Sequence, residues 1–257
     1  MFKKSKIVLT GILMTMILLA SGCSNGSSAA SSDNDKTLYF IPIVDTGAYW
    51  NPMKKGAEDA AKELGKRAAE EMKEKGITGG SIAIVCVDVA QPTMIDREKG
   101  LKEGFEEVYG TDAKNFKFLA TIQDNDQPSE SKKQLEGYIS ANKDLVTVFS
   151  LGSEGPDVGV MSAIESQGKS GKILHYGFDY TDTWLKGIED GRITAIVDQD
   201  AYQIGYQVIE NLVKAIDGEK IDATIPIDVK YVPAAELKSY GEEKGKIKTD
   251  SVEDSSK

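Results

Sequence analysis

The sequence predicts an α/β protein with a doubly wound, mostly parallel sheet, and two observations lead to this fold class. Short apolar, β-branched runs alternate with longer helical patterns from Thr37 onward. The strand-like runs are apolar throughout, which is typical of strands that are covered on both faces. Strands that are separated by helices usually form a parallel sheet with helices on both sides.

Strands and helices are expected in alternation. The strands are predicted at residues 38–44, 82–87, 116–122, 146–150, 173–177, 193–197 and 225–232. The helices are predicted at residues 52–75, 94–109, 130–142, 157–167, 183–190 and 202–217. Residues 236–257 are expected to be a polar tail, which from Glu242 to Lys257 has almost no apolar residue and is predicted to be disordered.

The first 22 residues have the features of a cleavable export signal. Positive charges at Lys3, Lys4 and Lys6 precede an apolar run at residues 7–20. This run is shorter than the roughly 20 residues that a membrane-spanning helix needs. Residues 19–23 (LASGC) resemble a bacterial lipobox, although the leucine lies one position further from the cysteine than usual. The resemblance implies cleavage before Cys23 and lipid modification of its thiol, and an ordinary secretory signal is the alternative.

Residues 23–36 are expected to be a flexible linker. They are polar, with no aliphatic side chain larger than alanine, and cannot form a core. A linker of this kind lets a folded body stand away from a membrane to which a lipid holds it. The sequence therefore predicts an extracytoplasmic, lipid-anchored protein.

Composition argues against several functions. Loss of the three N-terminal lysines takes the formal net charge from −10 to −13, and an acidic body does not favour nucleic-acid binding. Cys86 lies in an apolar run and is predicted to be a buried structural thiol. The sole histidine, His175, leaves a zinc site or a hydrolase triad without support. Residues 152–155 (GSEG) lack the spacing and the lysine of a phosphate-binding loop, so no metal or cofactor is expected.

Residues 52–75 are predicted to form one long helix. Asn51 is suited to cap it, and Pro52 is suited to its first position. Apolar residues recur at three- and four-residue steps and form one stripe. These residues are Met53, Ala57, Ala60, Ala61, Leu64, Ala68 and Met72. Because glycine costs about 1 kcal/mol relative to alanine inside a helix, Gly65 is the expected place of a bend.

Aromatic, amide and charged side chains gather in the segments that follow the predicted strands. These segments are residues 45–50, 88–97, 123–128, 151–156, 178–182 and 198–202. Ligands of parallel α/β sheets bind beyond the carboxyl ends of the strands. Rings beside carboxylates, amides and an arginine suit a polyhydroxylated ligand such as a sugar. Turn formation alone accounts for residues such as Asp124 but not for Tyr49, Trp50 or Gln199.

Several motifs resemble the type I periplasmic binding proteins of sugar ABC transporters, the ribose-binding-like group. Residues 38–65 resemble the first strand, aromatic loop and first helix of that family. Residues 97–100 (REKG), followed by Phe105, resemble its arginine motif. Residues 177–179 (GFD) and Gln199 with a later Gly-Tyr pair resemble two further signatures. The motifs occur in the family's order, so the chain is similar to this family over most of residues 38–232.

The resemblance implies which residues bind ligand. Tyr49 and Trp50 would stack on the ligand. Arg97, Asp179 and Gln199 would bind its oxygen atoms, and arginine offers a forked donor that lysine lacks.

One site position departs from the family. Ser153 and Glu154 stand where the family has an Asn-Asp pair. They are candidate contacts, and their different chemistry implies either that no contact is made at this place or that the ligand differs from those of the family.

The resemblance also implies that part of the first lobe is missing. Residues 37–65 resemble its start, residues 66–200 resemble the second lobe, and residues 201–235 resemble the C-terminal crossover helix and strand of the domain at 37–235. Several βα units that normally follow the first helix are absent. Apolar residues of the crossover helix are then expected to be exposed and to favour self-association. These residues are Tyr206, Ile209, Leu212 and Val213.

Together these observations predict a lipid-anchored extracytoplasmic solute-binding protein of an ABC importer that takes a sugar to its permease. The alternative is a non-transport interaction or signalling lipoprotein built from a remnant lobe. An enzyme is not expected, because adjacent carboxylates such as Asp179 and Asp182 are more typical of helix caps than of acid–base pairs.

Overall fold

The computed structural model describes residues 51–152, 155–222, 225 and 227–254, with side chains from Lys55 to Gly245 within those ranges. The expected export signal, linker and strand at 38–44 lie outside the described residues, as do Cys23, Tyr49, Trp50, Ser153 and Glu154. All described residues belong to one compact unit.

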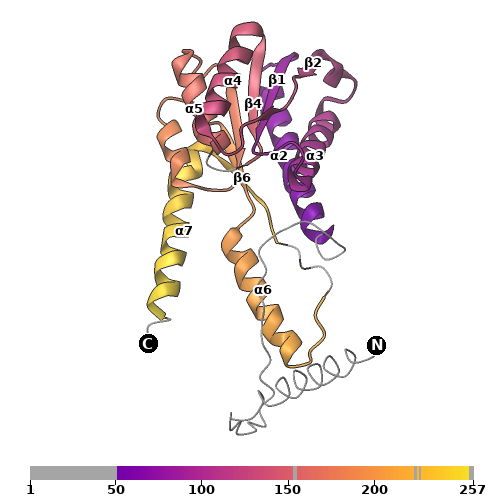
Figure 1. Ribbon diagram of the computed structural model, residues 1–257, viewed down its shortest axis with the longest axis vertical. Coiled ribbons are helices and arrows are strands. Elements are labelled where there is room, and N and C mark those ends of the chain that lie inside the picture. Colours follow the sequence, from indigo (N-terminus) through magenta and orange to yellow (C-terminus); the bar gives the residue numbers. More distant parts are fainter. Residues whose placement is uncertain (1–50, 153–154, 223–224, 226, 255–257) are drawn as a thin grey trace, which may run out of the picture. The chain divides into compact units, whose positions relative to one another are not determined.

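The described strands form one mixed sheet, in which most pairs are parallel (Figure 1). The strands are β1 (Gly80–Cys86), β2 (Phe116–Phe118), β3 (Ile122–Gln123), β4 (Leu145–Ser150), β5 (Leu174–Phe178), β6 (Ala195–Asp198) and β7 (Lys230–Pro233). Their spatial order is β2-β1-β4-β5-β6-β7, and β3 also pairs with β1. Only β7 is antiparallel to its neighbour among these pairs. The predicted α/β class with a mostly parallel sheet is confirmed.

Helices connect the strands. They are α2 (Asn51–Glu74), α3 (Pro92–Tyr109), α4 (Pro128–Ala141), α5 (Gly155–Ser166), α6 (Ala201–Ile216) and α7 (Ala234–Asp254), with the 3-10 segments η2 (Gly110–Asn115) and η3 (Asp182–Gly187). Among the described helices, none is long and apolar enough to cross a membrane.

The sheet is buried on both faces, as the continuous apolar strands predict. Along β1, Ile82 and Ile84 face a core that contains residues of α2 and α3. The alternate residues Ala83 and Val85 face a second core with residues of α4 and α5. This alternation follows from the two-residue period of a strand and gives the doubly wound arrangement.

Two predicted strands differ from the structure. The run at 116–122 is divided into β2 and β3, both of which pair with β1. The last strand is confined to β7, shorter than the predicted 225–232.

The prediction of a disordered tail is wrong for residues 242–254, which belong to a helix. Residues 234–254 form α7, and its first half is attached to the sheet. Leu237 and Tyr240 are buried in a core with Trp184 and Val232. These two residues are the buried apolar contacts of an otherwise polar helix.

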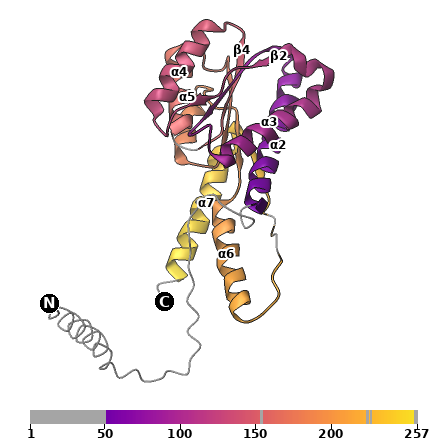
Figure 2. The same cartoon turned by 45° about the vertical axis from the view of Figure 1, so that its right-hand side comes forward.

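Helix α2 is continuous through Gly65, where a bend was expected. A Cβ atom at Gly65 would lie 2.1 Å from the carbonyl oxygen of Leu101 on α3. Gly104 of α3 approaches α2 in the same way, 2.0 Å from the carbonyl oxygen of Lys62. The glycines therefore let two helix backbones touch, and both views show α2 and α3 side by side (Figure 1, Figure 2). The expected lobe boundary at 65/66 falls inside this helix.

Helix α6 has no buried residue in the described structure, unlike α3, α4 and α5. Tyr206, Ile209 and Val213 are exposed by about half of their surface, at 55%, 54% and 48%, and Leu212 is half-buried. These positions recur on one side of the helix. The expected exposure of this helix is therefore observed.

Candidate functional site

Unusual backbone conformations mark the carboxyl-end edge of the sheet. The non-glycine residues with positive φ in the described chain are Asn125, Asp126, Asp179 and Asp200. They lie within three residues of the ends of β3, β5 and β6. Asn and Asp adopt this left-handed conformation more readily than most residues, and such positions often occur at binding sites.

Arg97 lies at the centre of this edge. It projects from the second turn of α3, and its side chain is only 10% exposed. Its Nη1 donates a hydrogen bond of 2.6 Å to the carbonyl oxygen of Leu151, just after β4. Its Nη2 lies 3.7 Å from Oδ2 of Asp179. The guanidinium also stacks on Phe178 of β5, with Cζ 4.3 Å from the ring centroid.

Burial lowers the pKa of Arg97, and the nearby carboxylates of Asp179 and Asp157 oppose this effect. An arginine in this state remains charged at neutral pH. The Nε–H of Arg97 has no hydrogen-bond partner within the described residues. Because a buried donor without a partner is costly, this N–H is suited to an acceptor on a ligand.

Asp179 joins Arg97 to Gln199. Its backbone N–H donates to the carbonyl oxygen of Val197 at 2.7 Å, which ties the end of β5 to β6. Its Oδ1 accepts a hydrogen bond of 3.0 Å from Nε2 of Gln199. Arg97, Asp179 and Gln199 therefore form one connected polar group from three different segments of the chain.

A second polar group lies beside the β3 and β4 ends. Oδ1 of Asp126 accepts a 3.2 Å hydrogen bond from the backbone N–H of Gly155. Oδ1 of Asp124 accepts a 2.9 Å bond from the backbone N–H of Asp126, and burial raises the pKa of Asp124. This group closes the turn before α4 against the start of α5, which agrees with a structural role for Asp124.

The sequence-predicted site residues are thus only partly placed. The structure brings together Arg97, Asp179 and Gln199, whereas the remaining candidates lie outside the described residues. Sequence reasoning missed Asp198, a buried carboxylate next to Gln199, because a single aspartate after a strand is usually a turn residue.

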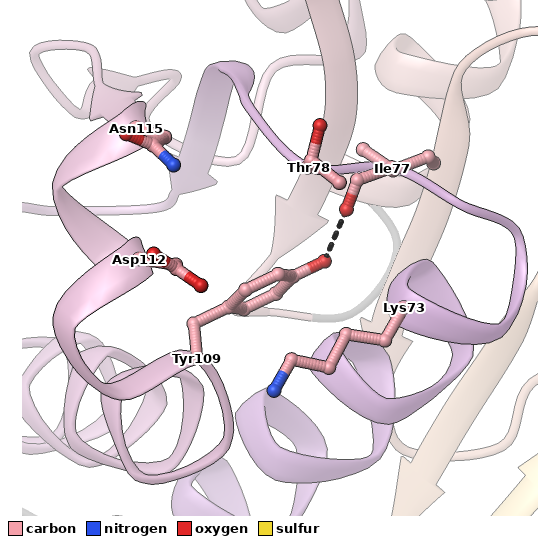
Figure 3. Close-up of a pocket in the computed structure, with 6 residues that line it drawn as sticks. All are labelled: Lys73, Ile77, Thr78, Tyr109, Asp112 and Asn115. Atoms are coloured by element: carbon pink, nitrogen blue, oxygen red, sulfur yellow. Dashed lines mark hydrogen bonds between the residues drawn. The ribbon is translucent and has the colours of Figure 1, made fainter.

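A separate pocket lies at the amino ends of β1 and β2, and Figure 3 shows the residues that line it. It has a volume of about 180 Å³ and is lined by Lys73, Ile77, Thr78, Tyr109, Asp112 and Asn115. Its side chains come from segments just before β1 and β2, at the amino ends of those strands. The hydroxyl of Tyr109 already donates a 2.7 Å hydrogen bond to the carbonyl oxygen of Ile77. Ligand pockets are usually at least about 300 Å³, so this pocket is small for a ligand site.

The sole histidine and Cys86 are core residues. His175 is fully buried, with Nδ1–H directed at the carbonyl oxygen of Arg192 and Nε2 placed to accept from Ser150. Cys86 is buried, and burial raises the pKa of its thiol to about 12. The prediction of a buried structural thiol is confirmed.

Comparison with known proteins agrees with the fold. The chain is 29% identical to the ribose import binding protein RbsB of Escherichia coli (strain K12) over 180 residues, which are 69% of this chain and 54% of that protein. It is 26% identical to the D-allose-binding periplasmic protein of the same organism over 60% of this chain and 46% of that protein. The chain thus spans about half the length of the curated relatives it matches.

Solved structures of solute-binding proteins are similar to this chain over part of their length. A solute-binding protein of an ABC transporter from Agrobacterium vitis, with bound D-fucose, aligns with a TM-score of 0.59 at 27% identity over 68% of this chain and 58% of that chain. The corresponding protein from Actinobacillus succinogenes 130z, with bound D-allose, aligns with a TM-score of 0.63 at 20% identity over 72% and 62%.

The sequence profile described as "Periplasmic binding protein domain" matches residues 62–220, from the middle of α2 to beyond α6. This match covers more than half of the chain and includes Arg97, Asp179 and Gln199. The chain therefore belongs to the periplasmic binding protein domain family.

Proposed function

We propose that this protein is the extracytoplasmic solute-binding component of an ABC importer and that it binds a sugar or a similar polyhydroxylated molecule. The named relatives are ribose- and allose-binding proteins, and the solved neighbours include proteins with bound D-fucose, D-allose and D-arabinose. A transport permease is the partner that this role requires. The relatives give no support to an enzymatic function.

One observation carries the proposal. The Nε–H of Arg97 is buried without a partner among the described residues, beside the joined side chains of Asp179 and Gln199. An unpaired donor therefore lies next to a carboxylate and an amide, groups that can all bond to the hydroxyl groups of a sugar. In this proposal Tyr49 and Trp50 stack on the ring, and Ser153 and Glu154 add contacts.

The proposal is tested by thermal unfolding of the purified protein with a panel of pentoses and hexoses that includes D-ribose and D-allose. A ligand at a hundredfold excess over its Kd stabilises the folded state by about 2.7 kcal/mol. For a domain of this size, that corresponds to a rise in Tm of roughly 5–10 °C. The rise is expected to disappear in Gln199→Ala and to persist in Arg67→Ala, whose arginine lies on α2. No rise with any sugar would contradict the proposal.

The lipid anchor is part of the same proposal. Cleavage before Cys23 and acylation of its thiol would hold the protein at the membrane through the linker at 23–36. Cells that express the chain with a radiolabelled fatty acid are expected to label it, and Cys23→Ser is expected to abolish the label. Export of an unlabelled wild-type protein would favour an ordinary secretory signal.

A second candidate function rests on the exposed face of α6. Tyr206, Ile209 and Val213 form an apolar stripe on a helix without buried residues, and such stripes often mediate association. A lipoprotein that pairs with a second copy of itself would use this face. Sedimentation equilibrium over a wide concentration range is expected to show dimers that Ile209→Lys removes and that the exposed-site control Gln203→Lys keeps. A monomer at all concentrations would exclude this alternative.

A further inference from the structure

Helix α7 reaches the candidate site through a buried carboxylate. Asp198 is 3% exposed, and its Oδ2 accepts a 2.5 Å hydrogen bond from the hydroxyl of Tyr240 and an ion-paired contact from Nζ of Lys244. Burial alone would raise the pKa of Asp198, but hydrogen bonds from Lys244, Tyr240 and the backbone of Tyr180 lower it overall. Asp198 is therefore an ionised group that α7 neutralises.

Asp198 holds the two segments that carry Asp179 and Gln199. Its Oδ1 accepts a 3.1 Å hydrogen bond from the backbone N–H of Tyr180, the residue directly after Asp179. Asp198 itself directly precedes Gln199. One carboxylate thus fixes both strand ends whose side chains are joined at the site.

Lys244 bridges both neighbours of Gln199. Besides Asp198, its Nζ lies 3.8 Å from Oδ1 of Asp200, and its side chain is only 18% exposed. Asp200 adopts the left-handed conformation and caps α6 through the backbone N–H of Gln203. The ammonium group therefore lies between the carboxylates that flank Gln199 on each side.

Tyr240 and Gly241 pack on the neighbour of Asp179. The rings of Tyr180 and Tyr240 meet edge to face with their centroids 5.8 Å apart. A Cβ atom at Gly241 would lie 1.8 Å from the hydroxyl oxygen of Tyr180, so α7 approaches this loop without a side chain between them. Helix α7 therefore packs closely on the loop after β5 through both Tyr240 and Gly241.

We infer that Tyr240 and Lys244 are positioning residues, through which α7 sets the geometry of Asp179 and Gln199 for ligand binding. The inference rests on the proposed sugar-binding function. In this inference neither residue contacts the ligand. Each acts through Asp198, whose charge must be matched for the two loops to keep their relative position.

Affinity for a sugar is the first readout. Lys244→Met keeps most of the length of the side chain and removes its charge, and Tyr240→Phe removes only the hydroxyl. Each is expected to weaken binding of the best sugar from the panel by about tenfold, the scale of one hydrogen bond to a charged group. Lys244→Arg is expected to restore most of the affinity. Lys238→Met, at an exposed position of the same helix, is the matched control and is expected to bind like the wild type.

A general loss of stability must be distinguished from a loss of positioning. Ile139→Val in α4 removes a methyl group from a core that contains no residue of α7 or of the loops that carry Asp179 and Gln199. It is expected to lower the Tm without changing sugar affinity, because it does not contact the site loops. If Ile139→Val weakens binding as much as Lys244→Met does, α7 has no specific role and the inference fails.

A ligand-free measurement keeps the inference separate from the proposed function. In ¹H–¹⁵N spectra, Lys244→Met is expected to shift the backbone amide of Tyr180 and the side-chain amide of Gln199, whereas Lys238→Met leaves both in place. If no sugar binds the wild type but these shifts occur, the proposed function fails and the positioning by α7 stands. If Lys244→Met and Tyr240→Phe leave these resonances unchanged, the inference is overturned whatever the protein binds.

Discussion

The guanidinium of Arg97 stacks on the ring of Phe178, with Cζ 4.3 Å from the ring centroid. Phe178 directly precedes Asp179, so one residue supports the face of the arginine while the next pairs with its edge. The hydrogen bond from Nη1 of Arg97 to the carbonyl oxygen of Leu151 fixes the orientation of the guanidinium within its plane. A planar, forked cation satisfies all of these contacts together, and a point charge on a flexible chain does not.

Arg97→Lys is therefore expected to lower the free energy of unfolding by about 1–3 kcal/mol, because a buried carbonyl loses its charged donor and the ring loses its stacking partner. Urea unfolding at neutral pH measures this change. Arg67→Lys is the control, since Arg67 pairs with Glu63 on the surface of α2 and exposed pairs contribute roughly 0–1 kcal/mol. Equal stability of the Arg97→Lys variant and the wild type would contradict the packed role of the guanidinium.

The contact between α2 and α3 gives a second prediction. A Cβ atom at Gly104 would lie 2.0 Å from the backbone of Lys62, so Gly104→Ala must separate the two helices. We expect a loss of about 1–3 kcal/mol, the range found when well-packed sites are overfilled. At Gly137 in α4, a Cβ atom would meet nothing within 4 Å, so Gly137→Ala is expected to gain about 0.5–1 kcal/mol from helix propensity. Thermal unfolding of both variants checks the opposite signs.

Gly65 shows why part of the fold could not be predicted from the sequence. The strands could be predicted because their apolar runs reflect burial on both faces, and α2 could be predicted from its apolar stripe. The role of Gly65 depends on α3, which lies against it only in the folded chain. Local propensity indicates a bend at this glycine, whereas tertiary packing uses it as a point of contact.

The candidate site, too, could be predicted only in part from the sequence. Arg97, Asp179 and Gln199 could be predicted because each belongs to a short motif with a family resemblance. Helix α7 could not, because few of its residues are apolar. Its ion pair joins Lys244 to Asp198, 46 positions earlier in the chain, and no local pattern indicates such a pairing.

Burial of Cys86 gives a prediction about reactivity. Its thiol is 2% exposed, and burial raises its pKa to about 12, so the reactive thiolate is scarce at neutral pH. In a Cys23→Ser variant, which keeps this single thiol, an aromatic disulfide reagent is expected to react only as fast as the protein opens. Addition of urea above the unfolding midpoint should release the full signal at once. Rapid reaction of the folded protein would show that the core around β1 opens locally.

His175 gives the protein a predictable dependence on pH. Burial lowers the pKa of His175 to about 4, while its hydrogen bond to the carbonyl of Arg192 opposes the shift. An unfolded histidine has a pKa of about 6.5. Between pH 4 and pH 6.5, His175 is therefore protonated in the unfolded state and neutral in the folded state. The stabilisation is complete above pH 6.5 and is lost as the pH falls toward 4.

Between pH 7.5 and pH 5.5, this linkage is expected to lower the free energy of unfolding by about 1.3 kcal/mol. Urea unfolding at the two pH values measures the difference. His175→Gln is the control, because glutamine can bond to Ser150 but does not titrate. That variant is expected to be less stable than the wild type at pH 7.5 and to lose little more at pH 5.5. Since His175 is the sole histidine of the chain, an equal loss in both proteins would mean that carboxylates, and not this buried imidazole, set the response to acid.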